Sequence, residues 1–146
     1  MSASINTLNF LDANVWLALL WNRHVHFQIA QDWFDRAGEE QFFWCRFTQI
    51  SVLRLLTTES ILGTDTRTMT QAWGIWDRVL EDPRISLLPE PDTLEQEFRS
   101  RSRLTSRSPK LWADAYLLGF SSAAGLKLVT FDQAMKARGA DVLVLN

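Results

Sequence analysis

Three acidic residues, far apart in the sequence, each lie where a predicted strand or helix meets a loop. Asp12 follows the apolar run of residues 8–11, Asp132 follows that of residues 126–131, and Asp114 lies in an amphipathic segment. In a parallel α/β sheet the carboxyl ends of the strands open onto one crevice, so these acids are expected to converge there. Neighbouring carboxylates cannot all stay ionised unless a cation neutralises them, and Mg²⁺ and Mn²⁺ prefer oxygen ligands. The acids therefore predict a metal site suited to phosphodiester hydrolysis.

Each acid has a predicted role and a simpler alternative. Asp12 and Asp114 would ligate the ion, and Asp132 would ligate it directly or through water. Thr130 and Asp132 flank one residue, so they point to the same side of the strand end, where Thr130 would orient the attacking water or a phosphate oxygen. Asp12 and Asp132 could instead only cap the helices that follow them. Asp114 lies past the capping position on an apolar helix face, where a carboxylate is either at the solvent edge or held by a partner.

Strand-like and helix-like segments alternate along the chain, which predicts an α/β fold with helices on both faces of a central, mostly parallel sheet of four to five strands. The predicted strands are residues 8–11, 42–45, 85–88, 126–131 and 142–145. The predicted helices are residues 15–21, 27–37, 48–56, 70–80, one around 94–98, one from 108 to 124, and 133–137. Asn14 and Thr48 are expected to cap two of them. Ile50 and Trp73 are expected on buried helix faces.

The bulk properties indicate a single globular domain spanning residues 1–146. A composition that is 47% hydrophobic and 22% charged excludes a largely disordered chain. The single Cys45 cannot form an internal disulfide. The sequence lacks an apolar stretch of the about 18 residues that a membrane span needs, and it has no signal-like N-terminus, so we expect a cytoplasmic protein without membrane contact.

Basic and histidine residues add two weaker signals. The most basic window leads into the Asp114 helix and contains Arg99, Arg101, Arg103, Arg107 and Lys110. It is either a solvated loop or an edge that follows phosphates, and Arg107 and Lys110 are candidate substrate-binding residues. His24 and His26 have spacing that could ligate zinc, but no further Cys or His supports a zinc site, so a structural or surface role is favoured.

Three segments together resemble the PIN-domain nucleases, and most closely the VapC-type toxin ribonucleases. They are FLDANVWLALLW, TQISVLRLLT and WADAYLLGFSSAAGLKLVTFD. The family's acids fall on Asp12, Asp114 and Asp132, and its hydroxyl falls on Thr130. The resemblance implies a PIN-like three-layer α/β/α fold and a Mg²⁺- or Mn²⁺-dependent endoribonuclease, the toxin of a type II toxin–antitoxin pair. It also implies a homodimer, an RNA substrate and inhibition by a VapB-like antitoxin encoded beside it.

The sequence departs from the family at one position. Family members commonly carry a glutamate on the middle helix where this chain has Ser51, although Thr48, Gln49 and Arg54 fit a subgroup that tolerates the change. Ser51 could hold a metal-bound water, and Ser51 and Arg54 are further candidates for substrate binding. With one carboxylate fewer, we expect one tightly held ion. The alternative is a catalytically weak PIN-fold module that binds RNA or protein. An aspartyl-nucleophile phosphatase is disfavoured because Asn14 stands where such enzymes need a second aspartate.

Overall fold

A parallel β-sheet forms the centre of the molecule in the computed structural model, which describes residues 7–138 and 140–146. Within these residues the sheet has five strands in the order β3-β2-β1-β4-β5, and every neighbouring pair is parallel. The strands are β1 (Leu8–Leu11), β2 (Gln41–Trp44), β3 (Ile85–Leu87), β4 (Lys127–Thr130) and β5 (Val142–Val144). The predicted strands are confirmed, with ends that differ by at most one residue.

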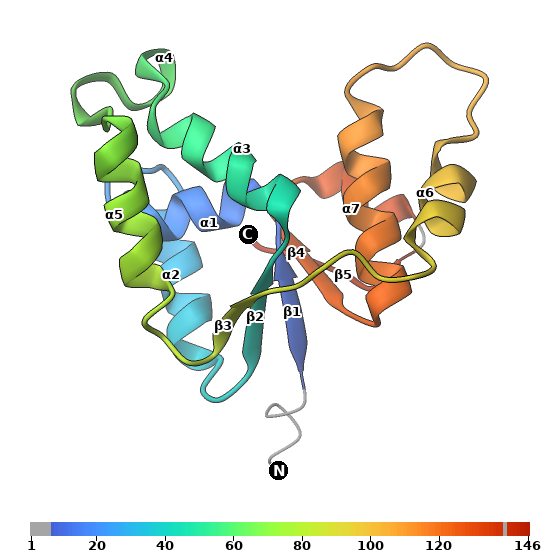
Figure 1. Cartoon of the computed structure of the whole chain (residues 1–146), viewed down its shortest axis with the longest axis horizontal. Helices are drawn as coiled ribbons and strands as arrows, with labels where there is room; N and C mark the ends of the chain where they lie inside the picture. The colour runs from blue at the N-terminus through green and yellow to red at the C-terminus, as the bar shows by residue number, and fades with distance from the viewer. Residues whose placement is uncertain (1–6, 139) are drawn as a thin grey trace.

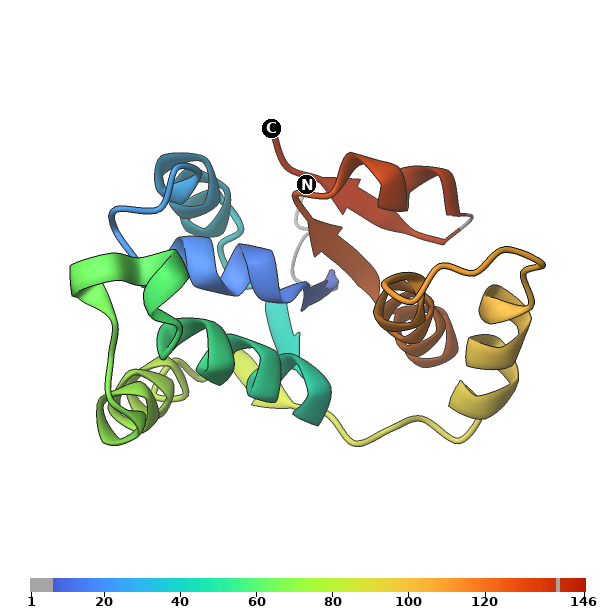
Figure 2. The ribbon, with the colours of Figure 1, turned by 90° about the horizontal axis from the view of Figure 1, so that it is seen from above.

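Helices cover both faces of the sheet (Figure 1). One face carries α1 (Ala13–Leu20), α2 (Phe27–Arg36), α3 (Arg46–Leu56) and α5 (Met69–Val79), and the other carries α6 (Leu94–Ser102) and α7 (Leu111–Ala124). The shorter elements are α4 (Glu59–Leu62) and the 3₁₀ segments η2 (Gly63–Asp65) and η3 (Gln133–Arg138). Figure 2 shows the two helix groups on either side of the sheet. This arrangement confirms the predicted three-layer α/β/α fold. None of the helices that the structure describes has both the length and the apolar character needed to cross a bilayer.

The alternation of side chains along each strand produces two separate cores. Leu11 packs on one face with Trp16 and Trp44, whose rings stack with their centroids 4.0 Å apart. Its neighbour Phe10 points to the other face and stacks on Phe120 of α7 at 4.7 Å. Successive residues of a strand point to opposite sides, so one strand serves both layers. The sheet is therefore held from both sides, which fixes where its carboxyl ends lie.

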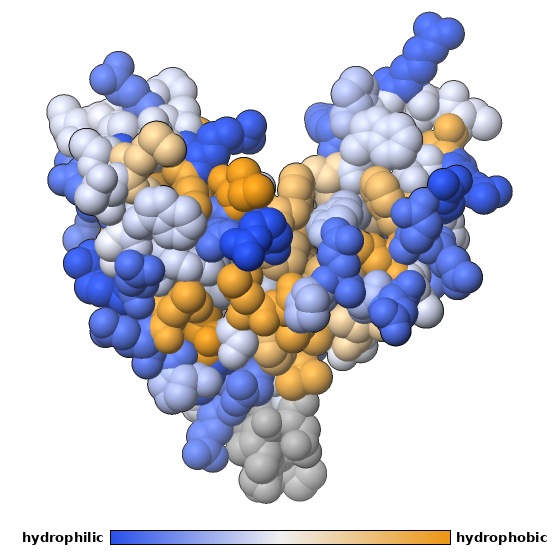
Figure 3. Space-filling view, viewed as in Figure 1, coloured by the Kyte–Doolittle hydropathy of each residue, from blue (hydrophilic) through white to orange (hydrophobic). Residues whose placement is uncertain are grey.

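The molecule is hollowed where those carboxyl ends emerge. Figure 3 shows a notch between an arm formed by α3, α4 and α5 and an arm formed by α6 and α7. The first residue after β1 and the last residue of β4 lie at the carboxyl edge of the sheet, and α7 begins on one side of the notch. Gly125, with a φ of 69°, ends α7 in the left-handed conformation that glycine adopts readily and turns the chain into β4.

Two helix starts differ from the sequence prediction. Asp12, not Asn14, is the residue before α1, and α3 begins at Arg46, so Thr48 lies inside its first turn. In both cases the side chain bonds elsewhere: Asn14 reaches across to β4, and the Thr48 hydroxyl lies 3.2 Å from the Cys45 sulfur. Residue type alone predicts capping at these two positions, but a distant partner on β4 holds Asn14 and a local partner holds Thr48.

Candidate functional site

Asp12 directly follows β1 and is turned toward β4. Its backbone amide donates to the carbonyl of Val129 at 2.9 Å, which continues the pairing of the two strands. Its carboxylate Oδ2 accepts a hydrogen bond of 2.8 Å from the Thr130 hydroxyl. The Asp12 carbonyl accepts the first amides of α1, but the side chain makes no capping hydrogen bond. The simpler alternative, in which the Asp12 carboxylate serves as a helix cap, is therefore wrong.

Thr130 is the centre of a small hydrogen-bond network at the end of β4. The side chain is fully buried, and its hydroxyl oxygen accepts from Asn14 Nδ2 at 3.3 Å and from the Asp132 amide at 3.1 Å. Asn14 Oδ1 accepts in turn from the amide of Phe131 at 3.3 Å. Because the hydroxyl donates its proton to Asp12, it orients that carboxylate, whereas the sequence suggested that it orients water or phosphate. Asn14 is the residue of this network that the sequence prediction missed.

The three acids lie close enough together to repel one another. Burial raises the pKa of Asp12, the hydrogen bond from Thr130 and the nearby Ala13 amide lower it, and the charges of Asp114 and Asp132 raise it again. Burial also raises the pKa of Asp114, with a further contribution from the charge of Asp132. A raised carboxyl pKa means that the ionised form is disfavoured where it stands. The geometry thus concentrates negative charge that only a cation or a proton can relieve.

Asp132 caps the segment that follows it and also lies near enough to the other two acids for its charge to act on them. Its Oδ1 accepts a hydrogen bond of 3.0 Å from the Ala134 amide, so this oxygen caps the segment that begins η3. The residue is only partly exposed, and its charge acts on both Asp12 and Asp114. One carboxylate can cap through one oxygen and use its remaining lone pairs elsewhere. Capping and metal binding are therefore compatible at this residue.

Two basic residues lie beside Asp114. The positive charges of Arg138 and Lys110 each lower the pKa of Asp114 against the larger effect of burial. Lys110 immediately precedes α7, and Arg138 ends η3. Lys110 was predicted from the basic window. Arg138 was missed, although the sequence shows it six positions after Asp132. Cations next to a carboxylate cluster are suited to hold a phosphate there.

The other candidates for substrate binding lie on α3 and in the loop between α6 and α7. Ser51 donates its hydroxyl to the carbonyl of Phe47 at 2.9 Å, within α3. Arg54 lines a hollow between α3 and α5, together with Trp73. Arg107 lies in the loop between α6 and α7. The roles proposed for these three residues stay predictions.

The donor chemistry fits a hard divalent cation. Among residues 7–138 and 140–146 no group of three or more His, Cys, Asp or Glu side chains lies close enough to hold a metal ion, so Asp12, Asp114 and Asp132 do not form a three-ligand group. Mg²⁺ does not need such a group, because it keeps several waters and is commonly bound by one or two carboxylates. Asp12 and Asp114, one after β1 and one in the first turn of α7, supply oxygen donors of that kind. In the same part of the chain, His24 and His26 belong to no metal-binding group; His24 Nδ1 accepts from the His26 amide, and the His26 ring stacks on Phe131.

Comparison with known proteins gives consistent results at the level of sequence and fold. The family model of the PIN domain matches residues 10–140. Ribonuclease VapC41 of Mycobacterium tuberculosis is 40% identical over 133 residues, which cover 88% of this chain and 91% of that protein. Ribonuclease VapC44 of the same species is 30% identical over 135 residues, which cover 86% of each chain.

Solved structures share the fold at much lower identity. VapBC2 from Rickettsia felis, bound to a DNA fragment from its promoter, matches with a TM-score of 0.64 at 9% identity, covering 94% of this chain and 98% of that one. VapC20 from Mycobacterium tuberculosis, a sarcin–ricin loop cleaving toxin, matches with a TM-score of 0.63 at 14% identity, covering 90% of this chain and 95% of that one. At such identities these two structures support the fold alone.

Proposed function

Because this chain belongs to the PIN-domain family of VapC ribonucleases, we propose that it is an endoribonuclease that requires Mg²⁺ or Mn²⁺ and acts as the toxin of a type II toxin–antitoxin pair. The observation that carries the proposal is the position of Asp12, which directly follows β1 and is held by the Thr130 hydroxyl at 2.8 Å, with the charges of Asp114 and Asp132 near enough to raise its pKa. Relatives named as ribonucleases support the activity. We further propose a single domain that acts in the cytoplasm.

The residues of the site divide into three tasks. Asp12 and Asp114 would hold the ion, with Asp132 in support, and the bound ion would supply positive charge and Lewis acidity for attack of water on the phosphodiester. Thr130 keeps the Asp12 carboxylate in one orientation through its 2.8 Å hydrogen bond. Lys110 and Arg138, which act on Asp114, would hold the phosphate in line for attack.

Conservative variants of the two acids test this function. Asp12→Asn and Asp114→Asn keep the side-chain volume and remove the charge, so each should abolish cleavage of a labelled RNA while circular dichroism still reports a folded chain. Chelation of divalent ions should stop the wild-type reaction, and Mg²⁺ or Mn²⁺ should restore it. Asp141→Asn is the matched control, since this exposed residue precedes β5. Cleavage that survives chelation, or either variant retaining full activity, would refute the metal-dependent mechanism.

A second function, a PIN-fold module that binds RNA or protein without cleavage, is favoured by one observation. The Ser51 hydroxyl, at the position where relatives commonly carry a carboxylate, bonds to its own helix. Calorimetric titration with Mg²⁺ separates the two functions, because the binding module has no use for the ion. Saturable binding that Asp12→Asn removes supports the nuclease, and its absence supports the module.

The proposed partners are a VapB-like antitoxin and a second copy of the chain. The solved structures of VapBC2 from Rickettsia felis and of FitAcB from Neisseria gonorrhoeae share this fold and support an antitoxin partner. Growth arrest on expression that is relieved by co-expression of a small neighbouring reading frame would support the antitoxin. Sedimentation of the purified chain measures the dimer.

A further inference from the structure

An exposed tryptophan lies at the start of the helix that carries Asp114. Trp112 is 59% exposed, although it lies within the first turn of α7. The indole meets the ring of Phe98 on α6 at an edge-on angle of 66° with centroids 6.1 Å apart, so Phe98 supports it from one side. A large aromatic ring that is supported on one side and mostly open to solvent can accept a flat partner.

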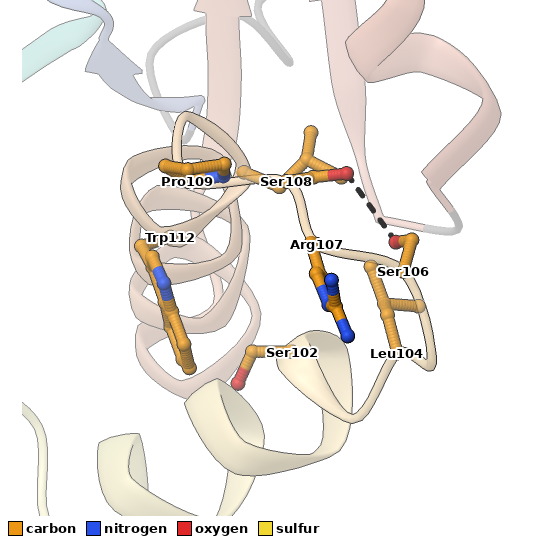
Figure 4. A pocket seen from close by; sticks show the side chains of 8 residues that line it. Ser102, Leu104, Ser106, Arg107, Ser108, Pro109 and Trp112 are labelled. Carbon is orange, nitrogen blue, oxygen red and sulfur yellow. Dashed lines mark hydrogen bonds between the residues drawn. The ribbon is translucent and has the colours of Figure 1, made fainter.

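A shallow hollow with cationic and apolar groups lies beside this ring. Figure 4 shows Arg107 with its guanidinium between Trp112 and Leu104, above the Ser102 side chain of α6. Leu104 is itself 52% exposed. The hollow measures about 240 Å³, below the ~300–1,000 Å³ of pockets that enclose small molecules. It is suited to a single planar group that rests on the surface.

The charged side chains around Trp112 are mostly arginines, and two of them are not paired with an acid among the described residues. A second hollow on the indole is lined by Arg99 and Arg103. Arg99 forms an ion pair of 2.6 Å with Glu95, whereas the side chains of Arg103 and Arg107 have no ion pair within residues 7–138 and 140–146. Arginines beside an open aromatic ring are complementary to a nucleotide, since the ring stacks on the base and the guanidinium pairs with the phosphate.

We propose that Trp112, with Arg107 and Arg103, is a subsite for single-stranded RNA that stacks one base of the substrate outside the reactive centre. The inference rests on the proposed ribonuclease function and adds a contact with one base of the substrate at Trp112. Trp112 and Asp114 are two residues apart and therefore lie on different sides of α7. A strand reaching both must cross the start of α7, over the helix diameter of about 10–12 Å. The stacked base thus lies a few nucleotides from the bond that is cleaved, and Lys110, four residues before Asp114, lies on the Asp114 side.

Binding of a fluorescein-labelled oligouridylate of about 12 nucleotides, within the ~4–16 nucleotides that single-strand sites cover, tests the subsite in the presence of chelator. Trp112→Ala should raise the Kd roughly 5- to 100-fold, as expected for the loss of one stacked base. Trp112→Phe should keep most of the affinity, and Trp112→Leu, which still packs on Phe98, should lose as much as alanine. Trp73→Ala is the matched control, because Trp73 is 46% exposed on the opposite arm.

The outcomes separate the subsite from the nuclease. On long RNA with Mg²⁺, Trp112→Ala should raise KM and leave kcat unchanged, because a remote contact contributes to binding alone. If the wild type cleaves RNA and Trp112→Ala binds and cleaves equally well, the subsite is refuted and the nuclease stands. The subsite is also refuted if Trp112→Leu binds like the wild type, or if sedimentation shows that Trp112→Ala only dissociates a dimer. If the wild type neither binds nor cleaves any RNA, the proposed function fails first.

Discussion

At the scale of single residues, a hydrogen-bond network holds the site together. It ends at the Asp12 carboxylate, whose ionised form is disfavoured by burial and by the other acids. Thr130 links β4 to Asp12, and Asn14 links α1 back to Thr130. Each bond fixes a donor or an acceptor that burial would otherwise leave without a partner, at about 1–3 kcal/mol for an unsatisfied group. The network positions the acids, but it does not remove their repulsion. The clustered carboxylates therefore lower the folding stability of the metal-free protein.

This effect predicts a dependence of stability on pH in the metal-free protein. The folded-state pKa of Asp12 lies above its ordinary value of 3.8, chiefly because of burial. Protons therefore bind the folded chain more tightly, and stability falls as the pH rises from 3.8 through the folded-state pKa. Asp12→Asn removes this loss while its Oδ1 can still accept from Thr130. Urea unfolding in chelator should show the variant to be the more stable protein at pH 7, with the difference disappearing near pH 4. A variant that is less stable than wild type at pH 7 would contradict the assigned burial of charge.

At the scale of elements, α7 positions Asp114, and a glycine sets how closely α7 approaches α6. A Cβ built on Gly119 would lie 3.0 Å from the Phe98 amide nitrogen and 3.2 Å from two further backbone atoms of α6. Backbone cannot rotate away as a side chain can, so a larger residue must push the two helices apart. Gly119 thus explains why a poor helix former stands in the middle of a buried helix.

Two glycine variants separate the effect of packing from that of helix propensity. A Cβ added to Gly74 of α5 would meet nothing within 4 Å, so Gly74→Ala should stabilise the chain by up to about 1 kcal/mol. Gly119→Ala gains the same propensity but must open the contact with α6, and overpacking typically costs about 1–3 kcal/mol. Urea unfolding should therefore rank Gly74→Ala above wild type and Gly119→Ala at or below it. If both variants are stabilised equally, α6 and α7 are not in close contact.

The elements also show what sequence patterns can and cannot predict. The strands were predictable because apolar runs such as residues 8–11 are buried on both faces, and the acids were predictable because they end those runs. The buried face of α3 was not predictable from the sequence, because Thr48 and Gln49 are buried while Ile50 is 57% exposed. Gln49 accepts from Arg46, so local bonds make burial of a polar residue tolerable. Trp73, predicted to be buried, lies 46% exposed across the hollow from Arg54, because hydrophobicity does not reveal which faces lack a covering element.

At the scale of the whole molecule, the net charge of −2 opposes the binding of a polyanion. Attraction must therefore come from a local group of cations, and the exposed residues Arg103, Arg107 and Lys110 lie together at the start of α7 with Arg138 beside Asp114. If the chain binds RNA as proposed, this group of cations is where the strand should be held. The local cations attract RNA phosphates while the net negative charge of the chain repels them. This combination favours one orientation of a bound strand and not a general affinity for nucleic acid.

This charge distribution predicts a shallow but measurable salt dependence. Each phosphate neutralised on a single strand contributes about −0.7 to the slope of log K against log salt, so four cations give a slope of about −2 to −3. Arg107→Gln should make the slope shallower by about 0.7 for the oligouridylate. Arg78→Gln, an exposed cation in the last turn of α5 on the opposite arm, should leave it unchanged. Equal changes for both variants would mean that the RNA is held by diffuse charge, and a slope near zero would mean that the basic residues at α7 do not contact phosphate at all.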